Sequence, residues 1–155
     1  MPNLQFANRA RKRQQGIAAI EFAIVFPVFF AILYGIITYG LILAAQQTLT
    51  MSASEGARAF LRYQTNVAER KTSACAVSNV ATLWIRSIAG AAAASSNCVP
   101  AGQAGVHVSD PEACGAYKCR KIIVTYNYKL NPLIPPLGLP VPDALTGSAI
   151  VQVVE

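Results

Sequence analysis

The residues best suited to chemistry in this sequence are four cysteines and one histidine. They are Cys75, Cys98, Cys114, Cys119 and His107. Thiolates and imidazole bind zinc, but no Cys-x-x-Cys pair is present and the spacings match no common zinc finger. The missing Cys-x-x-Cys also argues against thiol redox catalysis. His107 lies within Val-His-Val, which indicates a strand position rather than a metal ligand.

The even number of cysteines favours two disulfides. All four follow a long apolar segment, and a domain of about 100 residues outside the cytoplasm has a small core that covalent links help to stabilise. Three pairings are possible, and we favour Cys114 with Cys119 and Cys75 with Cys98. We expect no metal and no cofactor.

The other polar residues form no recognisable catalytic group. One histidine, seven scattered acidic residues and no glycine-rich phosphate loop leave acid–base, nucleophilic and nucleotide chemistry without candidates. The sequence therefore favours a structural assembly component over an enzyme.

One long apolar segment dominates the composition. The chain has 155 residues, and 54% are hydrophobic but only 13% are charged, about half the usual share. No acidic or basic residue occurs from Phe22 to Ser54. As a helix, the segment from Ile17 to Ala45 would be about 43 Å long, more than the bilayer's hydrocarbon core of about 30 Å. We expect residues 17–45 to cross a membrane once, which argues against a cytosolic enzyme or a disordered chain.

Most of the net charge of +6 precedes this segment, because residues 1–16 carry Arg9, Arg11, Lys12 and Arg13 and no acid. A basic block before a span predicts a cytoplasmic N-terminus, so residues 46–155 would form an extracytoplasmic domain. The basic residues do not alternate with aromatic ones, and we expect no nucleic-acid partner. A secretory signal peptide fits less well, since its apolar region is about 7 to 15 residues long.

Four residues of the span stand out. Glu21 is an acid at its start, where an ionised group either needs a partner or reaches back to the headgroups. Pro27 removes one backbone donor and predicts a kink. Ala31 and Gly35 form a small-xxx-small pair, which lets another helix approach closely.

The string Gly16-Ile17-Ala18-Ala19-Ile20-Glu21-Phe22 resembles the processing site of type IV prepilins and pseudopilins. In that group a membrane peptidase cuts after the glycine, and the glutamate becomes the fifth residue of the mature chain. The span, followed by Gln46-Gln47 and by Glu55-Gly56-Ala57-Arg58, is similar to TadE-like proteins of the tight-adherence (Tad, Flp) pilus system. The resemblance covers residues 9–63 and, more weakly, residues 120–155.

This resemblance implies a minor pseudopilin of the inner membrane, with residues 1–16 as a leader peptide. The implied partners are a prepilin peptidase, other Tad pilins and pseudopilins, the inner-membrane assembly platform and membrane lipid. Ile17 and Glu21 share one helix face, so Glu21 can neutralise the Ile17 amine that cleavage exposes, and the resemblance implies pairing with the amine of a neighbouring subunit. The alternative is an uncleaved signal-anchored envelope protein whose disulfide-bonded domain binds another component.

Beyond the span, we expect the helix to continue to about Tyr63, with Glu55 and Arg58 spaced to pair on its surface. A second amphipathic helix is expected to bury a stripe of five residues, with Trp84 in the core. The stripe consists of Val77, Val80, Ala81, Trp84 and Ile88. Small and polar residues then predict a loop over residues 91–105.

The C-terminal part of the chain is predicted to form two strands. Apolar residues alternate with polar ones between Lys121 and Leu130, which predicts a half-buried strand. Its inward face would consist of Ile122, Val124, Tyr126, Tyr128 and Leu130. Five prolines between Pro132 and Pro142 rule out a helix there, and residues 148–154 read as a second strand, antiparallel to the first. The predicted fold class is α+β, a pilin-like arrangement in which a long N-terminal transmembrane helix continues into a small disulfide-bonded domain with an antiparallel sheet.

Overall fold

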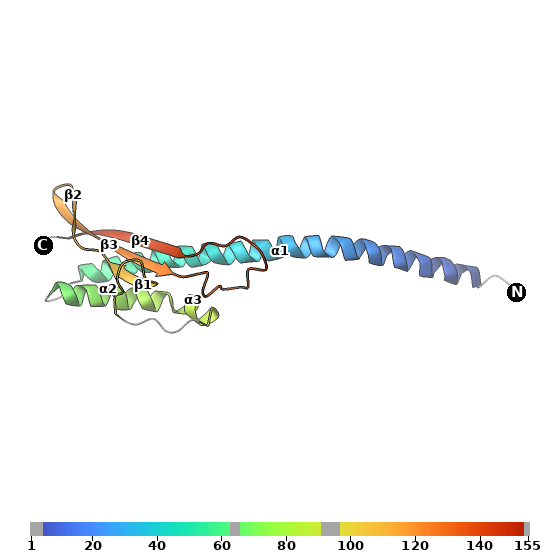
Figure 1. Ribbon diagram of the computed structural model, residues 1–155, viewed down its shortest axis with the longest axis horizontal. Coiled ribbons are helices and arrows are strands. Elements are labelled where there is room, and N and C mark those ends of the chain that lie inside the picture. The colour runs from blue at the N-terminus through green and yellow to red at the C-terminus, as the bar shows by residue number, and fades with distance from the viewer. Residues whose placement is uncertain (1–4, 63–65, 91–96, 154–155) are drawn as a thin grey trace. The chain divides into compact units, whose positions relative to one another are not determined.

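A computed structural model describes residues 5–62, 66–90 and 97–153, and it describes side chains from Gly16 onward. The chain divides into two compact units, Met1–Tyr39 and Gly40–Glu155. The side chains of the predicted basic block, the predicted helix end at Tyr63 and residues 91–96 of the predicted loop lie outside the described part. The helices and strands (Figure 1) are α1 (Gln5–Leu61), α2 (Val67–Ala81), α3 (Leu83–Ile88), β1 (Gly105–Val108), β2 (Glu112–Cys114), β3 (Tyr117–Tyr126) and β4 (Leu145–Val153).

In the Met1–Tyr39 unit, α1 is apolar and exposed. Its large apolar side chains from Ile17 to Ile37 are between 42% and 67% exposed, whereas the core helix of a soluble protein would bury them. Among the described residues, α1 is the one helix that is long and apolar enough to cross a membrane. The helix continues through Pro27, which lipid-embedded helices tolerate.

In the Gly40–Glu155 unit, α1 supplies one wall of the core. A stripe along the helix is buried at spacings of three and four residues, as expected for one packed helix face. It consists of Ile42, Ala45, Leu49, Ala53, Ala57 and Phe60. These residues join apolar side chains from α2, α3 and the sheet in a single core cluster.

Small residues bring α2 and α1 together. A Cβ on Gly56 of α1 would overlap the Ser78 hydroxyl of α2 and lie 3.2 Å from the carbonyl oxygen of Ala74. Ser52 of α1 exchanges hydrogen bonds with Ser78. Gly56 lies near Ala74, and Ser52, which is earlier in α1, contacts Ser78, which is later in α2. The two helices are therefore antiparallel.

The sheet is antiparallel and centred on β3. One edge of β3 pairs with β1 and β2, and the other pairs with β4 over its whole length, from Lys118 opposite Val153 to Tyr126 opposite Leu145. β4 packs on α1 at Gly147, where a Cβ would overlap the backbone of Leu49 and Thr50. Glycine at this position therefore allows the sheet and the helix to approach closely. The helix and sheet together confirm the α+β class.

Several predicted details of the sheet are confirmed. Ile122, Val124, Tyr126 and Tyr128 are buried as expected. The second strand pairs antiparallel with the first, and His107 lies in β1. The prediction that Leu130 is buried is wrong, because β3 ends at Tyr126 and Leu130 is 74% exposed in the following turn.

The predicted stripe through Trp84 is wrong. Val80 and Ile88 are exposed and Trp84 is partly so, while α2 instead buries Ala74, Cys75, Ser78 and Asn79. The close approach at Gly56 and the disulfide at Cys75 require small residues on the face that meets α1. The helix also breaks at Thr82, so α3 buries Ile85 rather than Trp84.

Candidate functional site

The residues expected at the processing site lie on an open stretch of α1. Gly16 has no atom within 4 Å of the position that a Cβ would occupy, and Ile17, Glu21 and Phe22 are exposed. Packing among the described residues therefore does not require glycine at position 16. A second protein that must approach the backbone at position 16 would require glycine at this position.

α1 has two different faces in this region. Ile17 and Gly35 are 18 residues apart, which is five full helical turns, so they lie on the same face; Glu21 is one turn beyond Ile17. Ala31 is one turn before Gly35 and borders the same face. This face, which we call the acid–small face, thus combines the carboxylate with the small-xxx-small pair.

An aromatic ladder occupies the opposite face. The rings of Phe22, Phe26, Phe30 and Tyr34 stack in sequence, with centroid separations of 5.2, 6.1 and 6.3 Å. Phe26 is nine residues from both Ile17 and Gly35, or two and a half turns, and so it lies opposite them. Sequence reasoning missed this ladder, although aromatic residues repeating at i, i+4 are the signal for it.

The motif from Glu55 to Arg58 has a structural explanation. Arg58 Nη1 lies 3.0 Å from Glu55 Oε1, so the two residues form the surface pair that their spacing permits, and such an exposed pair stabilises by about 0.3–0.5 kcal/mol. Gly56 is the contact point with α2, and Ala57 is buried. The motif therefore fixes where α1 meets the rest of its unit.

Both favoured cysteine pairs are disulfides in the structure. Cys75 of α2 is joined to Cys98, with Cα atoms 5.3 Å apart, and Cys114 of β2 is joined to Cys119 of β3. No cysteine is free, so none can act as a thiolate ligand. Among the described residues, no three His, Cys, Asp or Glu side chains are grouped as a metal site.

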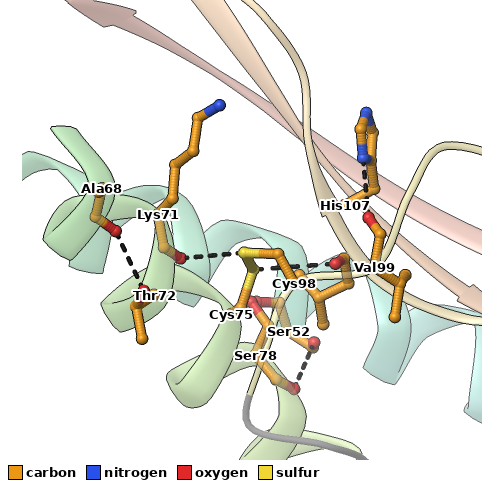
Figure 2. The surroundings of a disulfide bond; sticks show 10 residues. Ser52, Ala68, Lys71, Thr72, Cys75, Ser78, Cys98, Val99 and His107 are labelled. Carbon is orange, nitrogen blue, oxygen red and sulfur yellow. Dashed lines mark hydrogen bonds between the residues drawn. A yellow bond between two sulfur atoms is a disulfide. The ribbon is translucent and has the colours of Figure 1, made fainter.

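Figure 2 shows how the Cys75–Cys98 disulfide connects α2 to the segment before β1. The next residue, Val99, donates its backbone N–H to the carbonyl oxygen of Val106 in β1, and its own carbonyl oxygen lies 3.0 Å from Nδ1 of His107. His107 thus has a structural contact. The bridge and these contacts tie α2 to the sheet.

Comparison with known proteins matches the segment of α1 that holds the expected processing site, the two helix faces and the Glu55–Arg58 motif, and it does not include the cysteines. The family model described as TadE-like protein matches residues 16–58, from Gly16 to Arg58. No curated protein and no solved structure matches the chain. The TadE-like family comprises structural pilus components, and the match supports a Tad pilus-related component.

Proposed function

We propose that this chain is a TadE-like minor pseudopilin, a structural component for the assembly of Flp/Tad pili. The observation that carries the proposal is the extent of the family match, which starts at the expected cleavage residue Gly16 and ends at Arg58. In this proposal a prepilin peptidase removes residues 1–16 and leaves Ile17 as the new N-terminus.

The exposed apolar surface of α1 supports insertion into a membrane. The chain crosses the inner membrane once, with its N-terminus in the cytoplasm and residues 46–155 on the other side. Burying the exposed side chains in lipid removes them from water, at about 25 cal/mol per Å² of apolar surface. In the assembled state the chain would be associated with the pilus.

The acid–small face gives the span a side for partner helices. Ala31 and Gly35 let a neighbouring helix approach, and Glu21 would neutralise the Ile17 amine of an adjacent subunit. The aromatic ladder, on the opposite side, would then contact lipid. This arrangement assigns the other Tad pilins and pseudopilins to one face and membrane lipid to the other.

The pairing role of Glu21 is tested by Glu21→Gln. If Glu21 neutralises a neighbour's amine, the variant leaves a cation uncompensated near hydrocarbon, which costs about 3 to 5 kcal/mol for a buried pair and less at a wet interface. We expect Glu21→Gln to be inserted and cleaved but not to crosslink to partner pilins or to support piliation.

Glu55→Gln is the matched control, because Glu55 is on the same helix but forms an ion pair with the surface residue Arg58. This control should crosslink like the wild type. Normal crosslinking and piliation of Glu21→Gln would contradict the pairing role and favour a simple membrane anchor.

A further inference from the structure

Two groups of large apolar side chains in the Gly40–Glu155 unit are exposed and do not belong to its core. One is on α3, and the other is on the connection between β3 and β4. Together we call them the apolar end surface, which consists of Leu83, Trp84, Ile88, Leu130 and Leu137. Leu130 and Leu137 are 74% and 70% exposed, more than any other large apolar side chain among the described residues.

The packing of α2 locates α3 within this unit. Because α2 is antiparallel to α1, and Ser78 meets Ser52, the later residues of α2 and then α3 lie beside the part of α1 that precedes Ser52. Ile85 of α3 and Ile42 of α1 belong to the same core cluster. In Figure 1, α3 continues from the C-terminal end of α2.

The sheet locates the other group at the same end. Gly147 of β4 packs on Leu49, whereas Arg120, paired with Val151 of β4, lies over the ring of Phe60. β4 therefore runs away from Gly40, and the connection that precedes it lies toward Gly40. Leu133 of this connection shares the core cluster with Ile42.

This end of the unit is where the proposed span emerges. A hydrocarbon core of about 30 Å takes about 20 residues of helix, and each headgroup layer adds about 5 to 8 Å, or some four residues. A span that begins near Ile17 thus leaves the core near Tyr39, a residue type enriched at the interface. The headgroup layer then extends beyond residue 40, to the level of the apolar end surface.

Charge favours lipid headgroups over another apolar surface. Arg86 of α3 forms no ion pair with any side chain that the structure describes, and its Nε is buried without a hydrogen-bond partner. Burial lowers the pKa of Arg86, and nearby Tyr126 partly offsets this. The charges of Lys129 and Asp143 cancel in an ion pair of 2.9 Å. An unpaired arginine beside tryptophan and aliphatic side chains is typical of interfacial segments.

The backbone at Leu137, an exposed residue, has a conformation that leucine rarely adopts. Leu137 has φ of 40° and precedes Gly138 at 83°, in a turn closed by the Leu139 N–H and the Pro136 carbonyl oxygen. Asparagine or glycine normally occupies such a position. A strained turn that presents an exposed leucine suggests a contact outside the chain.

We propose that the apolar end surface rests on the bilayer that α1 crosses, with Trp84 and Leu137 in the headgroup layer close to the acyl chains and Arg86 facing lipid phosphate. This inference rests on the membrane anchoring in the proposed function. The contact would restrict how the extracytoplasmic domain tilts on the membrane.

The native fluorescence of Trp84 tests this contact, because Trp84 is the only tryptophan of the chain. The full chain is reconstituted in phosphatidylethanolamine–phosphatidylglycerol vesicles, with and without phospholipids brominated on the upper acyl chain. We expect the brominated lipid to quench most of the Trp84 emission. The control is Trp84→Phe combined with Ile150→Trp, since Ile150 is 69% exposed on β4 but farther from Gly40, and its emission should be almost unchanged.

Equal quenching at positions 84 and 150 would overturn the inference. So would a Trp84 that is shielded from iodide in water but unaffected by brominated lipid, because a second protein copy would then cover the surface. Alkaline extraction of the same vesicles tests anchoring separately. A chain that stays in the membrane with unquenched Trp84 refutes this inference alone, whereas a chain that is extracted refutes the anchor and the inference together.

The role of Arg86 is tested by changing the lipid composition of the vesicles. Quenching of wild-type Trp84 should be stronger in phosphatidylglycerol vesicles than in phosphatidylcholine vesicles, and Arg86→Gln should remove this difference. No difference for the wild type would refute the assignment of Arg86 to lipid phosphate.

Discussion

Ser52 and Ser78 join α1 and α2 by a reciprocal pair of buried hydrogen bonds. The hydroxyl of each serine donates to the backbone carbonyl oxygen of the other, and both distances are 3.0 Å. Gly56 lies one turn along α1, against the same Ser78 hydroxyl. These three small residues set the separation of the two helices, so their effects on stability should be coupled.

A double-mutant cycle tests this coupling. Gly56→Ala places a Cβ against Ser78 and should cost about 1 to 3 kcal/mol, while Ser78→Ala removes one hydrogen bond and should cost about 1 kcal/mol. Because Ser78→Ala also removes the obstructing hydroxyl, Gly56→Ala should cost less in that background, with an interaction energy of at least about 0.5 kcal/mol.

The measurement is urea unfolding of the full chain in mild detergent, followed by Trp84 fluorescence. Ser54→Ala is the control, since the Ser54 hydroxyl bonds only locally to the Met51 carbonyl oxygen, and it should change the free energy of unfolding by less than about 0.5 kcal/mol. Strict additivity of Gly56→Ala and Ser78→Ala would argue against the shared contact.

The two disulfides should contribute unequally to the free energy of unfolding. The Cys75–Cys98 bridge spans 23 residues and the Cys114–Cys119 bridge spans 5, and a longer closed loop removes more entropy from the unfolded chain. We expect the Cys75→Ala/Cys98→Ala pair to cost about 3 kcal/mol and the Cys114→Ala/Cys119→Ala pair about 2 kcal/mol. The same unfolding measurement gives both values, and a larger cost for the shorter bridge would contradict this order.

Local patterns were enough to predict the long apolar helix and the main strand, and the favoured choice among the three possible cysteine pairings is also confirmed. The apolar run from Ile17 to Ala45 is recognised without tertiary information, because it is long and contains a single charged residue, Glu21. The alternation from Ile122 to Tyr128 reflects one buried sheet face, which the sequence displays directly.

Features that depend on a distant partner could not be predicted in this way. The periodicity through Trp84 is helical, but whether that face or the face with Cys75 and Ser78 is buried depends on Gly56, which is in another helix. Gly147 is an ordinary strand glycine until Leu49 of α1 lies against it. The aromatic ladder, by contrast, was visible as an i, i+4 repeat and was overlooked.

The turn at Leu137 offers a stabilising substitution. Leu137→Asn replaces a leucine at positive φ with a residue that tolerates this conformation, and it should raise the free energy of unfolding in detergent by about 1 kcal/mol. Leu130→Asn is the control, because Leu130 is as exposed but is not among the residues with positive φ. If both variants have the same stability, strain at Leu137 does not affect folding.

Cleavage after Gly16 should depend on the size of that residue. Gly16→Leu should keep the basic leader, because the peptidase must approach the backbone at a residue without a side chain. Gly40→Leu is the matched control, since Gly40 also has open space around it in the same helix, and it should be cleaved normally. Immunoblots of membrane fractions resolve the two lengths, and normal cleavage of Gly16→Leu would show that the site is elsewhere.

Processing of this chain as a pseudopilin is tested by the intact mass of the wild-type protein extracted from the membrane. We expect a single mature species that begins at Ile17 and retains both disulfides. A species that still carries residues 1–16, or that begins elsewhere than at Ile17, would contradict the proposed processing and favour an uncleaved membrane-anchored protein or a different cleavage site.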